Sequence, residues 1–417
     1  MTDAFTLPIQ VVGAGPLSAW LVEDHSVPVV SVAWAWPGGA SMDTAGHEGT
    51  AALAAAMLTE GAGDLRALAF ADALRDSAIG LNFTAGRDNF EGSFRCLADA
   101  LPEALRLAKL AMTAPRMDAD ALERVRARAI AGARTQLETP RGQAGRAFWA
   151  SAFPGHPAGR PPNGTAESLT IIRPEALSAT LDAQLRRDGL LVAVAGAIRP
   201  AELAELMQDL FGALPAGAPA TPPPLPRFAS FGRQVVPVPG PQSQVVFGQP
   251  GIPPQDPSWE TAQIVLRVLG GGGFSSRLME AVRVQRGLTY GVGVGIDTLF
   301  GGGVIAGSFA TENGKVAEAL DVTRGVWAEL AQQGPTDAEL EESVAYLTGS
   351  LPLQFTDSRR IAATLLAMRR NDRPLDWLSG RNDRLRAITR ADAVRCAGTL
   401  LKPDALAVTV AGEPVGL

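Results

Sequence analysis

The stretch DGLLVAVAGAI at Asp188–Ile198 returns near the end of the chain as DALAVTVAGEP at Asp404–Pro414. Both are short apolar runs, rich in valine and alanine, that close on Ala-Gly, which is the pattern of a buried β-strand followed by a turn. Because the two runs hold corresponding places in the two halves of the sequence, they predict a fold that is built twice.

Two further pairs of segments repeat at about the same offset. Met117–Pro140 and Pro335–Ser358 share an acidic first turn followed by helical apolar spacing. Gly80–Met112 and Gly291–Leu330 each read as strand, turn, strand and amphipathic helix. Three concordant pairs favour an internal duplication over chance similarity.

Between the copies lies Phe211–Arg233, where repeated prolines remove backbone donors and prevent regular structure. We therefore predict an N-terminal domain over residues 1–210, a proline-rich linker over 211–233 and a C-terminal domain over 234–417. Each copy alternates hairpin-like strands with long helices. This indicates an α+β fold of two homologous domains, each a mostly antiparallel sheet covered on one face by helices.

The composition excludes several classes of protein. A chain of 417 residues with 46% hydrophobic residues can bury a large core, and it lacks the long apolar run that a membrane span needs. A net charge of −6 without basic clusters argues against nucleic acid as a partner. The start Met1–Gln10 does not read as a leader, so we expect a cytoplasmic protein, or a periplasmic one if a leader has been removed.

Cysteine and histidine are too sparse to suggest a metal or redox centre. Cys96 and Cys396 form no paired motif and are expected to be reduced and buried. His25, His47 and His156 are scattered at no helical spacing. A zinc site needs about three converging protein ligands, which this set does not readily supply.

The stretch Gly49–Leu58, GTAALAAAML, is expected to lie on a helix that starts near Gly46, after the strand-like Val27–Ala40. This segment resembles the zinc helix of the pitrilysin, insulinase and mitochondrial-processing-peptidase superfamily, in which two histidines four positions apart bind zinc and a glutamate between them acts as general base. Here the three positions hold Ala52, Ala55 and Ala56, which can neither ligate a metal nor accept a proton. The resemblance thus implies no metal and no cofactor in this chain.

The rest of the zinc motif is missing as well. The third ligand that the resemblance implies falls near Gly132 or Ala133, and Glu138 beyond them is a single carboxylate without histidine partners. The pair His47–Glu48 is half a motif, but the histidine required four positions later is Ala51. We predict that His47 and Glu48 instead cap the start of the helix.

The second copy carries a positive signal in Val268–Gly295, VLGGGGFSSRLMEAVRVQRGLTYGVGVG, which is similar to the second-domain signature of the same superfamily. The matching residues are Ser276, Arg277, Leu278, Arg283, Arg286, Gly287, Leu288 and Tyr290. The resemblance marks Arg283 and Tyr290 as reaching into a facing zinc cleft. A guanidinium can grip a peptide carbonyl and a phenol can donate to a developing oxyanion. The alternative is that both fill ordinary helix and strand positions.

Three other motifs carry weaker signals. Gly13–Gly15 lacks the third glycine of a dinucleotide-binding turn, and Gly270–Gly273 lacks the ending of a phosphate loop and reads as a flexible or tightly packed turn. Ile79–Phe94 reads as two strands that turn at Arg87–Asn89. An exposed edge there can add a peptide as a further strand, although an ordinary hairpin is the favoured interpretation.

Together these features predict a non-catalytic subunit of a heterodimeric zinc metallopeptidase, inactive alone. The resemblance implies a homologous partner chain that carries HxxEH and the zinc, with an extended peptide held between the two. Arg283 and Tyr290 would be this chain's contribution to catalysis. An inert scaffold, like the core subunits of respiratory complexes, and a peptide-binding homodimer stay open as alternatives.

Overall fold

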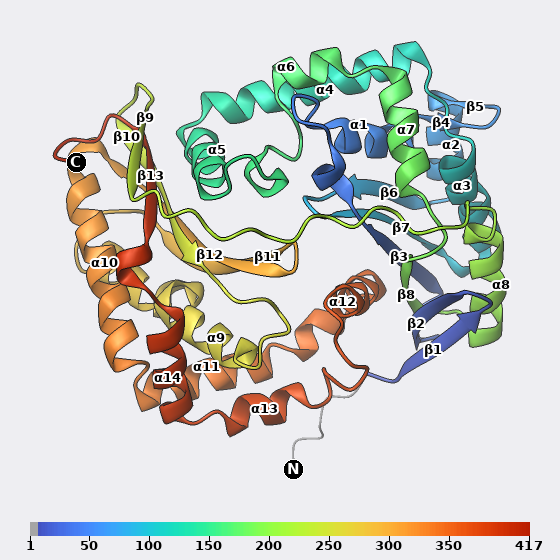
Figure 1. Cartoon of the computed structure of the whole chain (residues 1–417). Coiled ribbons are helices and arrows are strands. Elements are labelled where there is room, and N and C mark those ends of the chain that lie inside the picture. The colour runs from blue at the N-terminus through green and yellow to red at the C-terminus, as the bar shows by residue number, and fades with distance from the viewer. Residues whose placement is uncertain (1–6) are drawn as a thin grey trace. The chain divides into compact units, whose positions relative to one another are not determined.

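The computed structural model describes residues 7–417, leaving aside the side chain of Leu137. The chain divides into two compact units (Figure 1). Unit 1 comprises Met1–Arg134, Pro161–Pro223 and Pro352–Ser379, and unit 2 comprises Thr135–Arg160, Pro224–Leu351 and Gly380–Leu417. Residues 1–6, part of the start considered above for a leader, lie outside the described residues.

Unit 1 is built on a six-stranded sheet with the order β1-β2-β8-β3-β7-β6. All neighbouring strands are antiparallel except β2 and β8, which are parallel. The strands are β1 (Ile9–Ala14), β2 (Leu17–Glu23), β3 (Val29–Pro37), β6 (Gly80–Ala85), β7 (Asn89–Leu97) and β8 (Leu191–Gly196). A separate small hairpin joins β4 (Gly61–Ala62) to β5 (Leu65–Arg66).

Helices bury one face of this sheet. Alternate residues of β3, including Val32, Trp34 and Trp36, enter an apolar core, because successive strand side chains point to opposite faces. The helices of unit 1 are α1 (Thr50–Met57), α2 (Ala67–Asp76), α3 (Leu101–Thr113), most of α4 (Ala119–Glu138), α6 (Ala166–Ile171), α7 (Pro174–Gln184), α8 (Pro200–Phe211) and α12 (Ser358–Arg370).

Unit 2 repeats the plan with a five-stranded sheet of order β11-β12-β10-β13-β9. Its strands are β9 (Arg233–Pro237), β10 (Gln242–Pro250), β11 (Val292–Leu299), β12 (Gly302–Glu312) and β13 (Ala407–Gly412). Its longer helices are α5 (Pro140–Ala152), α9 (Trp259–Leu266), α10 (Val316–Gln333), α11 (Asp337–Gly349), α13 (Arg381–Ala387) and α14 (Arg390–Leu400). Residues 213–232, within the expected linker, form no helix or strand.

The duplication is visible strand by strand. The repeated runs became β8 and β13, each antiparallel to one neighbour (β3 or β10) and parallel to the other (β2 or β9). The hairpins β6–β7 and β11–β12 occupy matching edges of the two sheets. The predicted fold class, two homologous α+β domains with mostly antiparallel sheets, is confirmed.

Each unit also takes one helix from the other half of the sequence. In unit 1, α12 packs on the face of β3 and β8 that points away from the main core. Small side chains at Ser31, Ala33, Ala193 and Ala195 lie on that face, so the helix can approach the strands closely.

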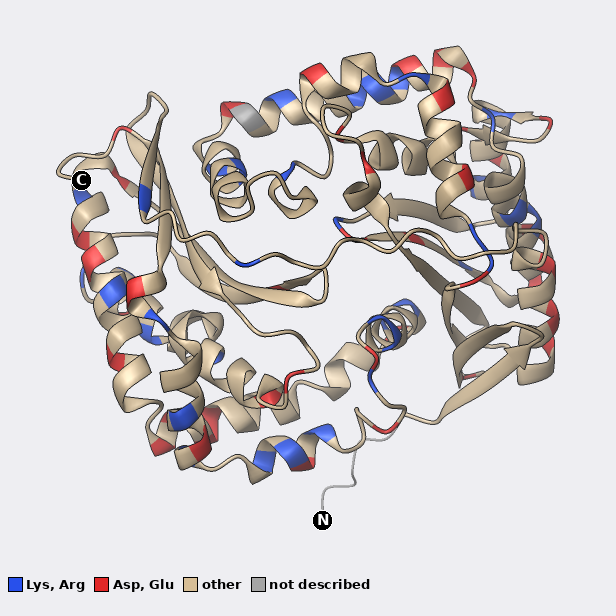
Figure 2. Cartoon of the chain, in the orientation of Figure 1, with Lys and Arg blue, Asp and Glu red and all other residues tan. Residues whose placement is uncertain are grey.

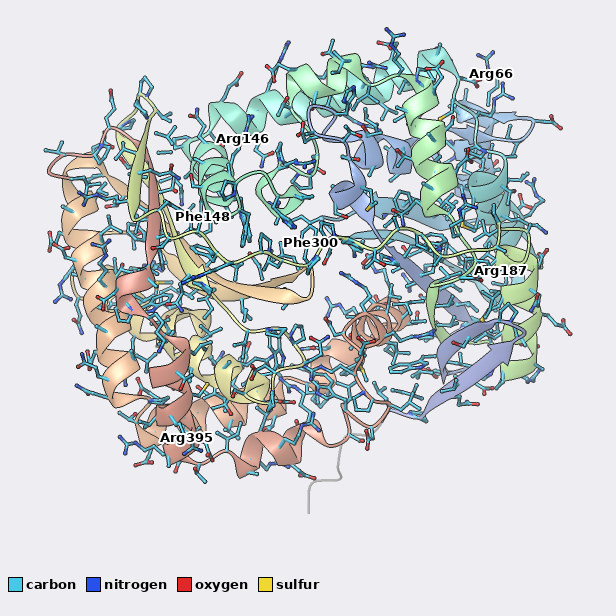
Figure 3. All side chains as sticks on the ribbon, in the orientation of Figure 1. Arg66, Arg146, Phe148, Arg187, Phe300 and Arg395 are labelled. Atoms are coloured by element: carbon cyan, nitrogen blue, oxygen red, sulfur yellow. The ribbon has the colours of Figure 1, made fainter. Side chains whose placement is uncertain are left out.

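In unit 2 the corresponding helix is α5, which packs on β10 and β13. Its Phe148 joins an apolar cluster with Phe228 and Phe300 (Figure 3). A Cβ atom at Gly248 would lie 2.7 Å from the Phe148 ring, so the close approach requires glycine there. The compact units are therefore discontinuous in sequence, and the expected boundaries at 210 and 234 describe the two copies along the chain rather than these units.

Charged residues of both signs are mixed on the helices, while the strands of both sheets are largely uncharged (Figure 2). Cys96 and Cys396 are free and buried, as expected. Among the described residues, no helix combines the length and apolar composition that a membrane crossing requires.

Candidate functional site

Helix α1 occupies the place that the resemblance assigns to the metal-binding helix. Ala55 is buried in the core of unit 1 together with Ala133 of α4, and Ala56 packs against the same core. Ala52 is half-buried, and Glu138 is exposed at the end of α4. Methyl groups offer a metal no donor atoms, so the residues at these positions do not fit a zinc ion.

The start of α1 is held by Asp43, a residue that the sequence interpretation missed. Its carboxylate accepts hydrogen bonds from the backbone N–H groups of Gly49 (2.8 Å) and Ala51 (2.9 Å). The prediction that His47 and Glu48 cap the helix is wrong, because the Glu48 carboxylate accepts from Gly46 N, ahead of the helix. Asp43 lies too far upstream of the helix to be recognised by a cap motif.

Burial raises the pKa of Asp43 from 3.8 to about 6, against the opposite effect of the backbone amides of Ala51, Gly49 and Thr50. A group whose pKa is raised in the folded state contributes stability that is fully present below its unfolded pKa. That contribution is lost as the pH rises through about 6.

We therefore expect an Asp43→Asn variant to gain stability relative to the wild-type protein as the pH rises from about 4 to about 7. The linkage relation puts the gain in the free energy of unfolding at up to about 3 kcal/mol. Urea unfolding of both proteins across this range measures it, and all other titrating groups are common to the two. A difference that stays flat would show that the pKa of Asp43 is not shifted by folding, and one that changes in the opposite direction would show that the fold stabilises the ionised carboxylate.

The second-copy signature divides into two groups of residues. Leu278 and Leu288 are buried in the core of unit 2. The buried Ser276 hydroxyl donates to Gly273 O, and Arg277 makes two 2.7 Å hydrogen bonds to the carboxylate of Glu339. These residues hold the segment in place, and the Glu339 carboxylate accepts from both Nε and Nη2 of Arg277.

Arg283 and Tyr290 form the other group, and the structure brings them together. The Arg283 Cζ lies 4.6 Å from the centre of the Tyr290 ring. The Tyr290 side chain is 88% exposed. Within residues 7–417 as described, neither the guanidinium nor the phenol makes a hydrogen bond or ion pair, so their polar atoms are available to a ligand.

Phe274 completes this cluster, and the sequence interpretation did not single it out. Its ring is 67% exposed, and its centre lies 4.6 Å from the Arg283 Cζ. Phe274 follows the glycine run, whose Gly270 packs so tightly that a Cβ atom there would lie 2.9 Å from Val294. The expected turn is helical instead, since Gly270 and Gly271 end a π-helical segment (Arg267–Gly271) and Gly273 begins a short 3-10 helix (Gly273–Ser275). This tightly packed segment places an aromatic ring beside Arg283.

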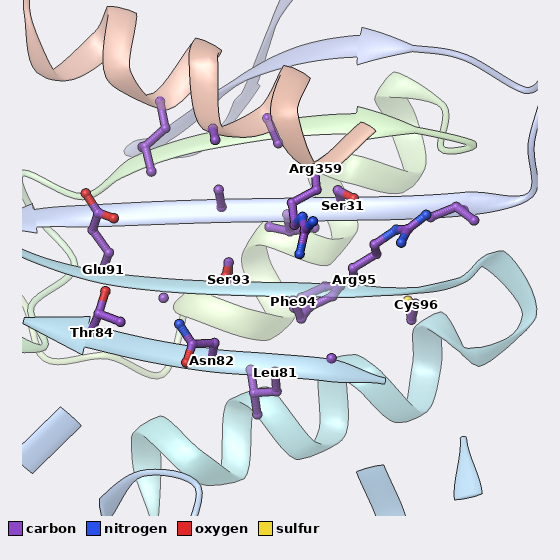
Figure 4. Close-up of a pocket in the computed structure, with 18 of the residues that line it drawn as sticks. Ser31, Leu81, Asn82, Thr84, Glu91, Ser93, Phe94, Arg95, Cys96 and Arg359 are labelled. Atoms are coloured by element: carbon purple, nitrogen blue, oxygen red, sulfur yellow. The ribbon is translucent and has the colours of Figure 1, made fainter. Parts of the chain in front are cut away.

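Unit 1 contains a groove of about 890 Å³ on the sheet face that also carries α12 (Figure 4). Its floor is formed by β3, β7 and β6, and α12 forms one wall. β6 is the edge strand of the sheet, paired only with β7. The predicted hairpin is confirmed, with β6 ending at Ala85 and β7 beginning at Asn89. An edge strand beside a groove offers both unpaired backbone groups and side-chain contacts to an extended chain.

Comparisons with known proteins agree with the signature. Residues 172–347 match the family model described as the peptidase M16 inactive domain. The non-peptidase homolog YmxG of Helicobacter pylori is 26% identical over 82% of this chain and 79% of its own length. The probable mitochondrial-processing peptidase subunit beta of Schizosaccharomyces pombe is 27% identical over 64% of this chain and 61% of its length. The chain spans about half the length of mycobacterial relatives described as uncharacterized zinc proteases.

Among solved structures, the peptidase M16 inactive domain from Pseudomonas fluorescens matches with a TM-score of 0.92 and 26% identity, covering 98% of this chain and 99% of that one. The match thus extends over both units. In sequence and in fold the chain is similar to members of the M16 peptidase superfamily, and it lacks the HxxEH zinc motif.

Proposed function

We propose that this chain is a non-catalytic subunit that binds an extended peptide and contributes to the active site of a zinc-bearing M16 partner chain. The observation that carries the proposal is that arginines of the same signature, Val268–Gly295, differ in whether the fold engages them. Arg277 is engaged by Glu339, whereas the half-buried Arg283 and the exposed Tyr290 have no hydrogen-bond or ion-pair partner within the described residues. Polar groups that the fold does not use are available for a substrate.

The two side chains suit different tasks. The guanidinium of Arg283 carries its donors in a rigid fork that can hold a peptide carbonyl in the ground state. The phenol of Tyr290 can donate a hydrogen bond to the oxyanion that develops on the scissile carbonyl. The Arg283 guanidinium beside the Tyr290 ring limits the motion of that ring, so the donor is partly pre-positioned.

The groove in unit 1 supports peptide binding independently. An extended peptide paired with β6 would complete backbone hydrogen bonds at the sheet edge and place alternate side chains over the groove. The floor offers small and polar side chains from the strands, including Asn82, Thr84 and Ser93. Such a surface accommodates varied sequences.

The names of relatives support a paired arrangement. The Schizosaccharomyces pombe relative is named as a peptidase subunit, and the mycobacterial relatives as zinc proteases. The Helicobacter pylori relative, named a non-peptidase homolog, favours the second candidate function, an inert scaffold of the same fold. These candidates differ in whether this chain increases peptide cleavage by its partner.

The test is reconstitution with an HxxEH-bearing M16 chain encoded in the same genome. We expect a stable one-to-one complex by size exclusion with light scattering, about one zinc per pair, and no stoichiometric zinc in this chain alone. Cleavage of a fluorogenic peptide should exceed that of the zinc chain alone about 100-fold or more, since one oxyanion donor alone supplies this much.

The other outcomes are informative. A stable complex without a gain in cleavage would favour the scaffold. Failure to form a complex, with self-association of this chain, would favour the peptide-binding homodimer. About one zinc per chain surviving dialysis of this protein alone would overturn the assignment of Ala52, Ala55 and Ala56 as a degenerate site.

A further inference from the structure

The charges that line the groove of unit 1 are unequally distributed. Three arginines line it, Arg95, Arg359 and Arg370, but Glu91 is the single carboxylate among its described lining residues. Glu91 accepts a 2.7 Å hydrogen bond from Arg370, which also lies 3.7 Å from Asp88. One arginine is therefore neutralised at the Glu91 end, and two remain.

The remaining two arginines are brought together at the other end by a specific contact. Ser31 of β3 shares a 2.9 Å hydrogen bond with Ser358, the first residue of α12. Arg95 is the direct cross-strand partner of Ser31 on β7, and Arg359 follows Ser358. Figure 4 shows both arginine side chains beside Ser31, with Glu91 at the opposite end of the groove.

Both guanidinium groups are available to a ligand. Arg95 and Arg359 are exposed, and in residues 7–417 as described neither side chain makes a hydrogen bond or ion pair. Arg95 also lies opposite Gly80 of the edge strand β6, where no side chain blocks the way from the edge to the guanidinium. The Asp357 carboxylate beside Arg359 caps α12 by accepting from the Arg359 backbone N–H (2.8 Å), and within the described residues it pairs with neither guanidinium. Two like charges without an acidic partner favour an anionic ligand.

We infer that the groove selects peptides that place a carboxylate at the Arg95–Arg359 end. This inference rests on the proposed binding of a peptide along β6 and names the chemistry that this binding prefers. The carboxylate is that of an aspartate or glutamate side chain or of a free C-terminus, because both present two oxygens to a guanidinium fork.

Strand geometry makes the preference positional. Arg95 and Glu91 are four residues apart on β7, which corresponds to roughly 13 Å along the strand. A carboxylate about four residues away from the Arg95 level would therefore meet the Glu91 end, where the neighbouring arginine is already paired. Only one end of a bound peptide should favour an acid.

The test uses the full chain and fluorescent peptides of about ten residues, built from threonine, valine and serine and amidated at the C-terminus. One aspartate is placed near either end in turn, and the matched peptides carry asparagine at the same place. Fluorescence anisotropy should show about tenfold tighter binding for one aspartate position over its asparagine match, and no preference at the other position. A peptide with a free C-terminus, compared with its amide, separates the terminal carboxylate from the side-chain source.

Variants of the protein identify the residues responsible. Arg95→Gln and Arg359→Gln should each reduce the preference for aspartate severalfold while leaving affinity for the asparagine peptide unchanged. Arg360→Gln is the matched control, since Arg360 is an exposed neighbour on α12 that does not line the groove. It should leave the preference intact.

The outcomes separate the two proposals. Equal binding of all peptides, in the wild-type protein and the variants, overturns the carboxylate selection but leaves peptide binding standing. Absence of binding by any peptide overturns both. A preference that survives in the double variant Arg95→Gln/Arg359→Gln places the carboxylate elsewhere and rejects this assignment.

Discussion

Tyr290→Phe is expected to lower peptide turnover by the reconstituted pair about 100-fold to 1,000-fold. Loss of one oxyanion donor costs roughly 3 to 4 kcal/mol of transition-state stabilisation. The ring is 88% exposed, and the phenol makes no hydrogen bond within the described residues, so the melting temperature should barely change. Steady-state cleavage and thermal melting of the variant measure the two effects.

The chain supplies a matched control. Tyr346, the second of its two tyrosines, is also exposed, and the Arg267 guanidinium lies 3.5 Å from its ring centre. Tyr346→Phe should leave turnover unchanged. Arg283→Ala should raise KM as well as lower kcat, because its fork would hold a ground-state carbonyl. Unchanged turnover in both Arg283 and Tyr290 variants would refute their roles, and lost activity with a large fall in melting temperature would favour a structural role.

Arg369→Ala is expected to destabilise unit 1 by about 3 to 5 kcal/mol. The half-buried guanidinium of this α12 residue donates to Ser18 O (2.7 Å), Val192 O (2.6 Å) and Ser18 Oγ (3.0 Å). Burial lowers the pKa of Arg369, and no carboxylate within the described residues pairs with it. Removing this side chain takes charged hydrogen bonds from β2 and β8 and leaves a cavity beneath α12.

Hydrogen exchange localises this effect. Amides of β2 and β8 should lose protection in the Arg369→Ala variant, whereas those of β10 and β12 in unit 2 should not. The adjacent Arg370→Ala is the control. Its half-exposed side chain pairs with Glu91 near the surface, and such pairs contribute about 1 kcal/mol or less. Equal loss of protection in both variants would show that Arg369 does not anchor the helix.

The duplicated architecture could be predicted because its signals are local. A few consecutive apolar residues predict the buried strands β8 and β13. The polar residues Arg87–Asn89 predict the turn between β6 and β7. The alanines of α1 could be placed because a helix fixes the spacing of the motif that they replace.

Other features depend on contacts between residues far apart in sequence. Asp43 caps α1 only because the chain between them folds back, and no cap spacing predicts that. The cluster of Phe274 with Arg283 and Tyr290 depends on the tight packing of the glycine segment Gly270–Gly273. Arg95 and Arg359 lie near each other only because α12 packs on β3. The small side chains of Ser31 and Ala33 allow this packing, but the sequence alone does not predict it.

The exchange of α5 and α12 between the two halves of the sequence has a consequence for synthesis on the ribosome. Unit 1 is still incomplete when the first 223 residues of the chain have emerged, because Pro352–Ser379 is translated much later. Helix α5 is translated before the unit 2 strands on which it packs. For much of translation, the face of the first sheet that carries Ser31 and Ala33 therefore stays exposed. It is covered only after α12 has been synthesised.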